Sequence, residues 1–242
     1  MVLCRRRPEH LTLTLLYADE HLVAIDKPPG LLVHRTQLAA HEDEAALQRL
    51  RDQLGRPVWP VHRLDRGTSG VLLFALSPEV ASRLGAMFEQ GQMHKRYLAL
   101  VRGWPPDEQG LVDHPLARDP ERPSAGQTLL DAQTRWRVLE RREWLLATDP
   151  RFATTRVALL EAEPLQGRRH QIRRHLKHIA HPILGDATHG KGPLNRAVAA
   201  FLGTQRLWLH AHRLAFEHPL LGTALALEAP PAIEWRLGLQ AG

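Results

Sequence analysis

The segment VHRLDRGTSGVLLFAL, residues 61–76, is the most informative part of this chain. Its first part, 61–70, is rich in charged, polar and glycine residues, and its second part, 71–76, is a plain apolar run. Such a run next to turn residues is typical of a buried strand. The sequence therefore predicts a polar loop that leads directly into the core, so that the side chains of this loop are held at the end of a rigid strand.

The elements around this segment follow from periodicity and end signals. The alternation in LVAIDKPPG predicts a strand over Leu22–Asp26, closed by a turn at 27–30. A helix is expected over Asp43–Leu54, because its apolar residues share one stripe and a glycine follows it. Downstream, Ser77-Pro78 has the residue types of an N-cap and a first helical position, and it opens a second helix.

The remainder of the chain is expected to be mostly strands. The stretch Trp104–Leu129 contains Pro and Gly and has no clear periodicity, so it is expected to be a long loop. A basic helix is expected within residues 165–186, with Ile172, Leu176 and Ile179 facing inward. Strands are predicted at Lys95–Gly103, Thr134–Glu140, Glu143–Thr148 and Thr155–Glu161, and a hairpin is predicted from Arg206–Phe216 and Thr223–Glu228.

These elements indicate an α+β fold around a mixed, mainly antiparallel sheet. The tally is about eight strands and four helices, in an order that does not repeat β-α-β strictly enough for a doubly wound sheet. No internal repeat, low-complexity tract or linker interrupts the pattern. The sequence therefore predicts a short N-terminal arm, residues 1–16, and a single domain over residues 17–242.

Composition excludes several classes of protein. Of the 242 residues, 43% are apolar and 24% are charged, which is ordinary globular usage and argues against disorder. The chain has no apolar run of membrane-spanning length and no signal-peptide start, so it is expected in the cytoplasm without a membrane partner. With Cys4 as its only cysteine, it can form no internal disulfide and no thiolate zinc cage.

Charge points to a polyanionic partner. The net charge is +6, and the span from Pro164 to Gly185 carries no acidic residue although it is crowded with basic ones. A localised basic patch of this kind favours a nucleic-acid partner. The basic side chains that we expect to contact phosphates are Arg168, Arg169, Arg174 and Lys177.

Three residues are candidates for chemistry, and each has a structural alternative. Asp65 is either a turn aspartate that satisfies backbone N–H groups or a carboxylate delivered to a cleft. Tyr97 is either a core tyrosine with its hydroxyl at the surface or a residue that stacks on a base or relays a proton. Arg173 lies at the edge of the apolar stripe of its helix; charges there are usually solvated, but a partly buried arginine would keep an aspartate ionised.

Other kinds of site fit poorly. The four histidines between His170 and His181 lack the i, i+4 spacing and the carboxylate of a helical zinc motif, so no metal is expected. Ser69 does not lie in a G-x-S-x-G elbow, which argues against a hydrolase triad. The glycines form neither a P-loop nor a dinucleotide fingerprint, and we therefore expect no cofactor.

Four motifs carry a resemblance to a known family. HRLDRGTSGVLLFAL, KRYLALVRG, GRRHQIRRHLKHIAHPILGD and RLWLHAHRL occur in this order, and each resembles a motif of the RluA-type pseudouridine synthases. The resemblance runs from about Tyr17 to Pro230. It implies a mixed fold with a central, largely antiparallel sheet crossed by a basic cleft, which agrees with the independent strand count.

The resemblance also implies roles for individual residues. Asp65 is similar to the catalytic aspartate of the family, Tyr97 to the aromatic residue at the target base, and Arg173 to the arginine that is salt-bridged to the aspartate. Leu209 resembles an apolar residue of the pocket, and Arg63 resembles an arginine that fills the gap left by a flipped base. Arg66, next to Asp65, is included among the expected RNA contacts.

The implied reaction converts a uridine of RNA to pseudouridine. The absence of an S4-type domain, the phrase GLLVHR at 30–35 and the basic motif favour a tRNA substrate modified where the T-stem meets the acceptor stem. The same reaction on 23S rRNA or on another tRNA site stays open, as does a non-catalytic RNA-binding module. No protein partner is expected, and the chain is predicted to act as a monomer. Gly67 stands where several relatives carry a larger residue or Pro, and Trp104–Leu129, a loop expected to touch RNA, matches weakly.

Overall fold

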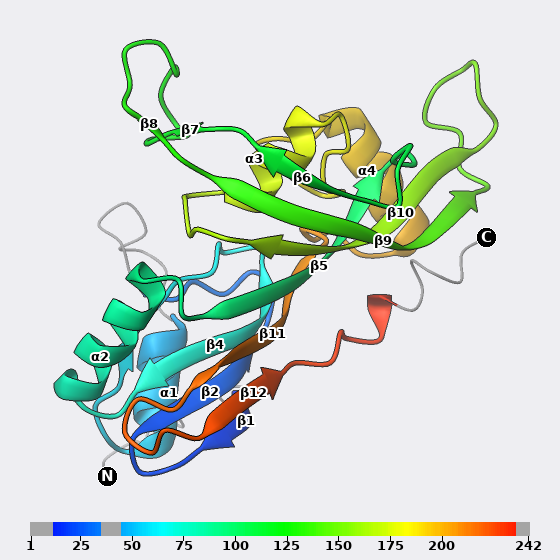
Figure 1. Ribbon diagram of the computed structural model, residues 1–242. Coiled ribbons are helices and arrows are strands. Elements are labelled where there is room, and N and C mark those ends of the chain that lie inside the picture. The colour runs from blue at the N-terminus through cyan, green and yellow to red at the C-terminus, as the bar shows by residue number, and fades with distance from the viewer. Residues whose placement is uncertain (1–11, 35–44, 236–242) are drawn as a thin grey trace, which may run out of the picture.

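A computed structural model of the chain describes residues 12–34 and 45–235. Within these ranges, ten strands form one sheet, whose main path runs β1-β2-β4-β11-β5-β10-β9-β6, and two short strands pair separately (Figure 1). Every pairing in the large sheet is antiparallel except that of β4 with β11. The predicted α+β class with a mainly antiparallel sheet is confirmed.

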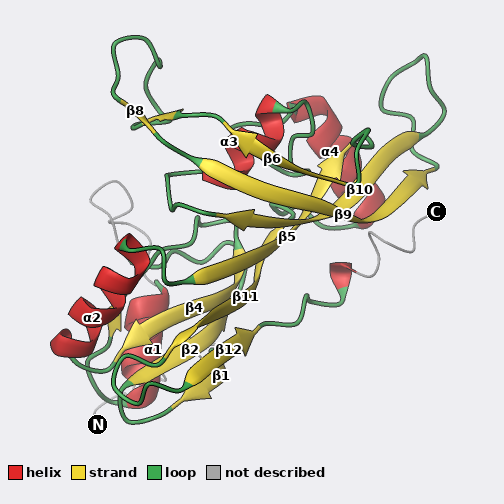
Figure 2. Cartoon of the chain, viewed as in Figure 1, coloured by secondary structure: helices red, strands yellow, loops and turns green. Residues whose placement is uncertain are grey.

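The strands have the following bounds: β1 Thr14–Ala18, β2 Leu22–Lys27, β3 Trp59–Pro60, β4 Ser69–Ala75, β5 His94–Arg102, β6 Gln109–Asp113, β7 Leu116–Ala117, β8 Leu129–Leu130, β9 Gln133–Trp144, β10 Thr155–Pro164, β11 Leu209–Glu217 and β12 Ala224–Glu228. The helices are α1 Ala46–Leu54, α2 Pro78–Glu89, α3 Gln171–His178 and α4 Gly192–Leu202 (Figure 2).

The helices begin and end at the residues that the sequence provides for this purpose. Ser77 caps α2 by accepting a hydrogen bond from the Val80 N–H at 3.3 Å, as its residue type predicts. Gly55 ends α1 in the left-handed conformation, with φ of 65°. The predicted start of α1 at Asp43 lies outside the described residues.

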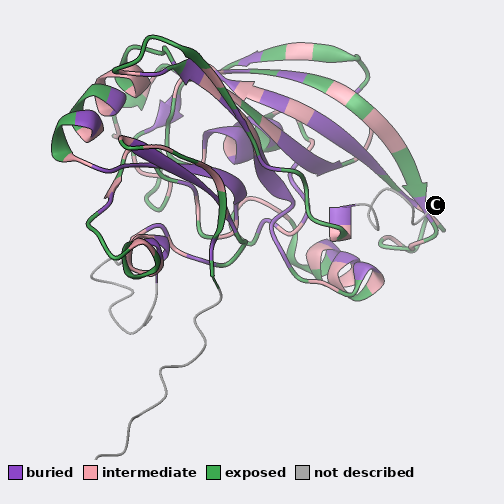
Figure 3. Ribbon diagram, turned by 90° about the horizontal axis from the view of Figure 1, so that it is seen from below, coloured by how far each residue is buried: buried purple, intermediate pink, exposed green. Residues whose placement is uncertain are grey.

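The core consists of three clusters of buried side chains. Two of them lie on opposite faces of the part of the sheet that contains β2 and β4. On β2, Val23 and Ile25 pack on the α1 side, whereas Leu22 and Ala24 pack on the α2 side. A third cluster packs β5, β9 and β10 against α3 and α4. β4 is therefore buried along its whole length and β2 at all but one residue. Figure 3 shows buried stretches, in purple, along strands in the interior of the molecule. β5 and β11 join the part of the sheet that contains β2 and β4 to the part that contains β9 and β10.

Several expectations about elements were wrong. Trp104–Leu129 is not one long loop, because β6 and β7 lie inside it and β8 begins at its end. The strand expected before Arg141–Arg142 continues through these two residues to Trp144 as β9, whereas residues 145–148 of the strand expected at Glu143–Thr148 are not in a strand. β9 pairs with β10 over Thr134–Trp144, with one register shift. The sequence reading also missed α4, and β11 begins at Leu209 rather than at Arg206.

None of the helices in the described part of the chain is long and apolar enough to cross a membrane.

Candidate active site

Asp65 lies in the loop between β3 and β4, and this loop is tied to the turn after β2. The Thr68 N–H donates to the Asp65 carbonyl at 3.0 Å, and the Gly30 N–H donates to the Arg66 carbonyl at 2.9 Å. Lys27, fully buried beneath, donates to the carbonyls of Pro28, Leu31 and Arg66 at 2.8–3.1 Å. Burial lowers the pKa of Lys27 to about 7, although the nearby Asp65 opposes this shift. These hydrogen bonds from Lys27 and Gly30 hold the backbone of the Asp65 loop in place.

Close backbone packing brings this loop beside β11. Gly70 has φ of +107°, and a Cβ built there would lie 2.2 Å from the Ala211 carbonyl oxygen. Only glycine fits this position. At Gly67, in contrast, a Cβ would meet only the Leu207 side chain, at 2.9 Å.

Arg173, on α3, binds two carboxylates at once. Its Nη1 donates to Asp65 Oδ2 at 2.8 Å, while Nε and Nη2 donate to the two oxygens of Asp186, each at 2.8 Å. Burial opposes the positive charge, but the hydrogen bonds and charges of Asp186 and Asp65 outweigh it and raise the pKa of Arg173. The predicted pairing of Arg173 with Asp65 is present in the structure.

Asp186 was missed by the sequence reading. Its side chain is only 1% exposed, and it also accepts the N–H groups of Thr188 and His189 at 2.9 Å. Burial raises its pKa, but the hydrogen bonds and charge of Arg173 and the two N–H groups lower it overall. The number of donors on Arg173 could have indicated a second partner. A guanidinium has five N–H donors, which is more than one carboxylate accepts, so a buried arginine needs a further acceptor. Asp186 ends the basic motif that contains this arginine.

Tyr97 and Leu209 come from neighbouring strands, β5 and β11, whose register pairs Leu209 with Ala99 and Tyr97 with Ala211. Both side chains line the same cavity as Asp65. Burial, with a smaller contribution from the charge of Asp65, raises the pKa of Tyr97, so its phenol stays protonated at neutral pH. The tyrosine is therefore an apolar surface with a hydroxyl, not a phenolate.

The cavity has a volume of about 490 Å³, which suits a ligand of nucleoside size. Asp65 and Arg173 lie in its wall, and three further basic residues that the sequence singled out, Arg63, Arg168 and Arg169, also line it. The Arg63 side chain is exposed there. The site therefore combines a carboxylate, an aromatic ring and a cationic lining.

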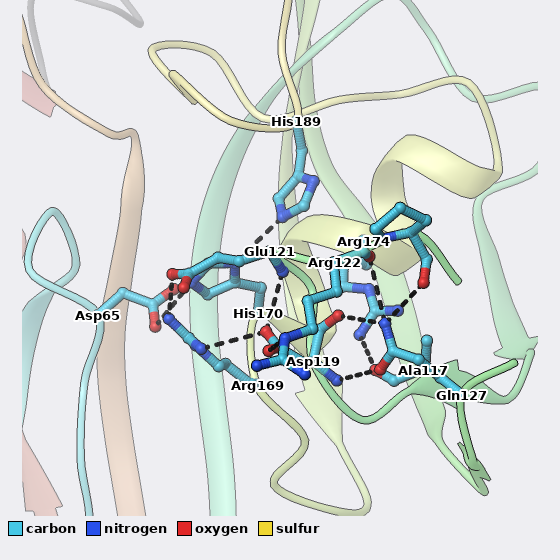
Figure 4. Close-up of polar contacts among 11 residues, drawn as sticks. Asp65, Ala117, Asp119, Glu121, Arg122, Gln127, Arg169, His170, Arg174 and His189 are labelled. Carbon is cyan, nitrogen blue, oxygen red and sulfur yellow. Dashed lines mark hydrogen bonds and ion pairs between the residues drawn. The ribbon is translucent and has the colours of Figure 1, made fainter. Parts of the chain in front are cut away.

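The other predicted RNA contacts lie outside the cavity lining. Arg66 donates from Nε to the Gly30 carbonyl at 3.0 Å, and Arg174 donates to the Ala117 carbonyl at 2.9 Å. Lys177 is exposed on α3. Arg169 lines the cavity but is paired with Asp119 and Glu121, which lie in the loop between β7 and β8 (Figure 4).

The four histidines of the basic motif have different environments. His175 is buried and bonds Thr134 and the His114 carbonyl, His178 stacks on His114, and His181 bonds the Arg102 carbonyl. His170 alone faces the cavity. Among the described residues, no group of three or more His, Cys, Asp or Glu side chains is arranged to hold a metal ion. Ser69 is buried and bonded to His210 and Arg206.

Comparison with known families defines the class of the protein. The family model described as RNA pseudouridylate synthase matches residues 21–178, which include Asp65, Tyr97 and Arg173. The chain belongs to this family. Its members are RNA pseudouridine synthases, which are isomerases.

Individual relatives narrow the comparison. The chain is 46% identical over 222 residues to the tRNA pseudouridine synthase C of Vibrio cholerae serotype O1, with 90% of each chain covered. It is 44% identical over 236 residues to the enzyme of the same name from Pasteurella multocida, with 93% of this chain and 94% of the relative covered. Among solved structures, human RNA pseudouridylate synthase domain containing 4 has a TM-score of 0.70 at 26% identity, covering 94% of this chain and 92% of that one. Human RNA pseudouridylate synthase domain containing 1, with a TM-score of 0.73 at 24% identity over 93% of this chain and 86% of that one, shares the fold.

Proposed function

We propose that this protein converts a uridine of tRNA to pseudouridine and that Asp65 is its catalytic residue. In this isomerisation the N1–C1′ bond breaks, the uracil turns, and a C5–C1′ bond forms. C5 loses a proton and N1 gains one, so the reaction consumes no outside atom and needs no oxidant or reductant. The protein must supply an anionic group at the sugar, a surface that holds the detached base, and a site from which water is largely excluded.

The observation that carries this proposal is the pairing of Asp65 with Arg173 in the wall of a nucleoside-sized cavity. Arg173 binds Oδ2 of Asp65 at 2.8 Å, which favours the carboxylate form and fixes the side chain. The anionic oxygen either traps the electron-poor sugar carbon or removes a proton from the sugar. Tyr97 and Leu209 supply the apolar walls against which the free uracil turns.

A uridine stacked in an RNA helix cannot reach a carboxylate in this cavity, so the nucleotide must leave the stack. Extrusion costs a few kcal/mol, which contacts in the pocket partly offset. The exposed Arg63 is suited to occupy the space that the uridine leaves. Arg168 and Arg169, with Lys177 further along α3, supply cations for the flanking phosphates.

We propose tRNA as the substrate because the relatives that match over 90% or more of this chain are named for a tRNA-modifying enzyme. Within tRNA, we propose a uridine where the T-stem meets the acceptor stem. We further propose that residues 17–242 act as one catalytic unit and as a monomer; in support of one unit, the residues that line the cavity run from Val61 to Leu209. Modification of 23S rRNA or of another tRNA position is an alternative outcome of the same assay.

The test is release of tritium from tRNA that carries tritium at C5 of uridine. The unaltered protein should release tritium in proportion to one uridine per tRNA. The Asp65→Asn variant should release none above background, while its Kd for tRNA stays within about threefold, because phosphate contacts supply most of the affinity. Asp52→Asn is the matched control: it removes an exposed carboxylate of α1 that is paired with Arg51, and it should keep full activity.

Unchanged turnover in Asp65→Asn would overturn the assignment of that residue. Salt-dependent tRNA binding by the unaltered protein without any tritium release would instead identify an RNA-binding module that lacks the chemistry. Chemical mapping of pseudouridine in the product tRNA identifies the position, and modification of 23S rRNA with no modification of tRNA would refute the substrate.

A further inference from the structure

His170 faces the reactive group of the proposed site. Its Nε2 lies 3.8 Å from Oδ1 of Asp65, whereas Arg173 binds the other oxygen, Oδ2. The His170 side chain is 13% exposed and lines the cavity. The imidazole is therefore on the side of the carboxylate that Arg173 leaves to the substrate.

The start of the helix α3 does not require a histidine at this position. His170 is the N-cap of α3, yet its side chain makes no capping hydrogen bond. Its φ is 55°, in the left-handed region, where among the described residues the only other non-glycine is Ala180. Glycine, Asn or Asp adopts this backbone at lower cost, and Asn or Asp also caps better. Strained residues of this kind cluster at functional sites, so the position points to a role for the side chain.

A second imidazole holds the first one in place. His170 Nδ1 and His189 Nε2 are 3.1 Å apart (Figure 4). The His189 backbone N–H donates to Asp186 at 2.9 Å. Asp186 in turn binds Arg173, which binds Asp65. These contacts form a chain of five residues that starts at Asp65 and returns to within 3.8 Å of it at His170, a distance too long for a hydrogen bond.

The pair is neutral at neutral pH. Burial lowers the pKa of His170, with Asp65 opposing the shift, and burial lowers the pKa of His189 to about 4. One proton lies between His170 Nδ1 and His189 Nε2. His170 Nε2 is therefore a donor in one tautomer and an acceptor in the other. A neutral imidazole brings no charge to pair with a phosphate, and a hydroxyl, which is both donor and acceptor, bonds to either tautomer.

We propose that His170, held by His189, hydrogen-bonds the ribose 2′-hydroxyl of the target nucleotide and makes the enzyme specific for a ribonucleotide at that position. The 2′-hydroxyl is on the carbon next to C1′, the atom that Asp65 must approach, so it lies within reach of Nε2. It is also the group by which a protein distinguishes RNA from DNA at a given nucleotide. This inference rests on the proposed function.

The test compares two tRNA substrates that are identical except at the target position, which carries either uridine or 2′-deoxyuridine. Single-turnover rates are measured for the unaltered protein and for His170→Gly, a variant that suits the left-handed backbone and therefore folds. The unaltered protein should favour the uridine substrate by about 10–100-fold, the range for one buried hydrogen bond. In His170→Gly, the rate with uridine should fall by a similar factor, and the rate with 2′-deoxyuridine should change by less than about threefold.

Binding provides a second readout that does not depend on turnover. Both proteins carry Asp65→Asn so that no turnover occurs. The protein that keeps His170 should bind the uridine substrate with a lower Kd than the 2′-deoxyuridine substrate, whereas the protein that also carries His170→Gly should bind both substrates equally. His189→Ala, which keeps the first imidazole but releases it, should lose part of the preference. His178→Ala is the matched control, since this exposed histidine lies on the same helix and stacks on His114 away from the cavity.

Equal slowing of both substrates in His170→Gly, or an equal change in both Kd values, would overturn the inference and leave the proposed function intact. No activity of the unaltered protein on the uridine substrate would refute the proposed function itself, and the role of His170 would fall with it.

Discussion

Asp186→Asn tests whether the second carboxylate on Arg173 positions the catalytic pair. The change keeps the size of the side chain but replaces one oxygen with an amide that repels the guanidinium. Asp186 accepts two bonds from Arg173 at 2.8 Å and two from backbone N–H groups at 2.9 Å, and it is 1% exposed. Because Arg173 keeps Asp65 as a partner, the free energy of unfolding should fall by about 2–4 kcal/mol, less than the cost of leaving a buried charge alone.

The effect on catalysis should exceed the effect on binding. Without Asp186, the guanidinium of Arg173 is no longer held at two of its nitrogens, and a displacement on the order of 1 Å costs about 100-fold in rate. Single-turnover tritium release should therefore slow by about 10–100-fold. The Kd for tRNA should change by less than about threefold, since Asp186 does not line the cavity.

The assay combines single-turnover rates, tRNA binding and urea unfolding, with rates measured well below the unfolding transition of the variant. Glu79→Gln is the control: it removes an exposed carboxylate from Arg83, a pair at 2.9 Å on α2, and should cost no more than about 0.5 kcal/mol with no loss of rate. A destabilised Asp186→Asn protein with an unchanged rate would refute the positioning role and leave Asp186 a purely structural residue.

Three further predictions concern RNA binding, folding and pH. The double variant Asp119→Asn, Glu121→Gln removes both ion-pair partners of Arg169 and leaves its guanidinium free to bind a phosphate. Filter binding should therefore show tighter tRNA binding, and the slope of log Kd against log salt concentration should be steeper by about 1. An unchanged slope would contradict this prediction. Gly70→Ala should lower the free energy of unfolding in urea by more than about 3 kcal/mol, because its Cβ would clash with the backbone of β11, and a loss below about 1 kcal/mol would contradict this. Burial lowers the pKa of His210 from 6.5 to about 4, so the unfolded chain binds a proton there that the folded protein does not, and stability should fall from pH 6.5 to 4 by up to about 1.4 kcal/mol per pH unit. When the free energy of unfolding in urea is plotted against pH over that range, the slope should be shallower for His210→Gln than for the unaltered protein. Equal slopes would contradict the prediction that His210 is neutral when buried.

Local patterns predicted the elements whose signals are local. The buried strand β4 follows from its apolar run, α2 from Ser77-Pro78, and the inward face of α3 from the spacing of Ile172 and Leu176. The helix α4 carried a comparable signal that the sequence reading passed over, since Leu194, Val198 and Leu202 share a stripe and Gly203 follows.

Elements that depend on pairing were not predictable in this way. β6 is a five-residue strand at the edge of the sheet, and it exists because β9 supplies its hydrogen-bonding partners. β9 continues through Arg141 and Arg142 because β10 lies alongside it, and these two residues pair in regular register with Ala158 and Val157. Local propensity cannot reveal a partner that lies tens of residues away.

The residues of the site also fall into those that sequence motifs predicted and those that depend on tertiary contacts. Asp65, Tyr97, Arg173 and Leu209 were named from motifs, and the structure brings them to one cavity although they are far apart in the sequence. Asp186 and His189 were not named as site residues, and His170 was considered only as a metal ligand, because the sequence does not show which side chains bind the remaining donors of a buried arginine or face a carboxylate. Such contacts require the register of β5 and β11 and the placement of α3 against β9 and β10.

The central claim is that the carboxylate of Asp65 meets the sugar of an extruded uridine, and a structure of the Asp65→Asn variant bound to its unreacted tRNA tests this most directly. The account predicts that the target nucleotide lies outside the helical stack, with C1′ about 3–3.5 Å from the side chain of residue 65 and the uracil against Tyr97. A complex in which the uridine stays stacked, or in which its C1′ lies on the far side of the cavity from residue 65, would contradict it.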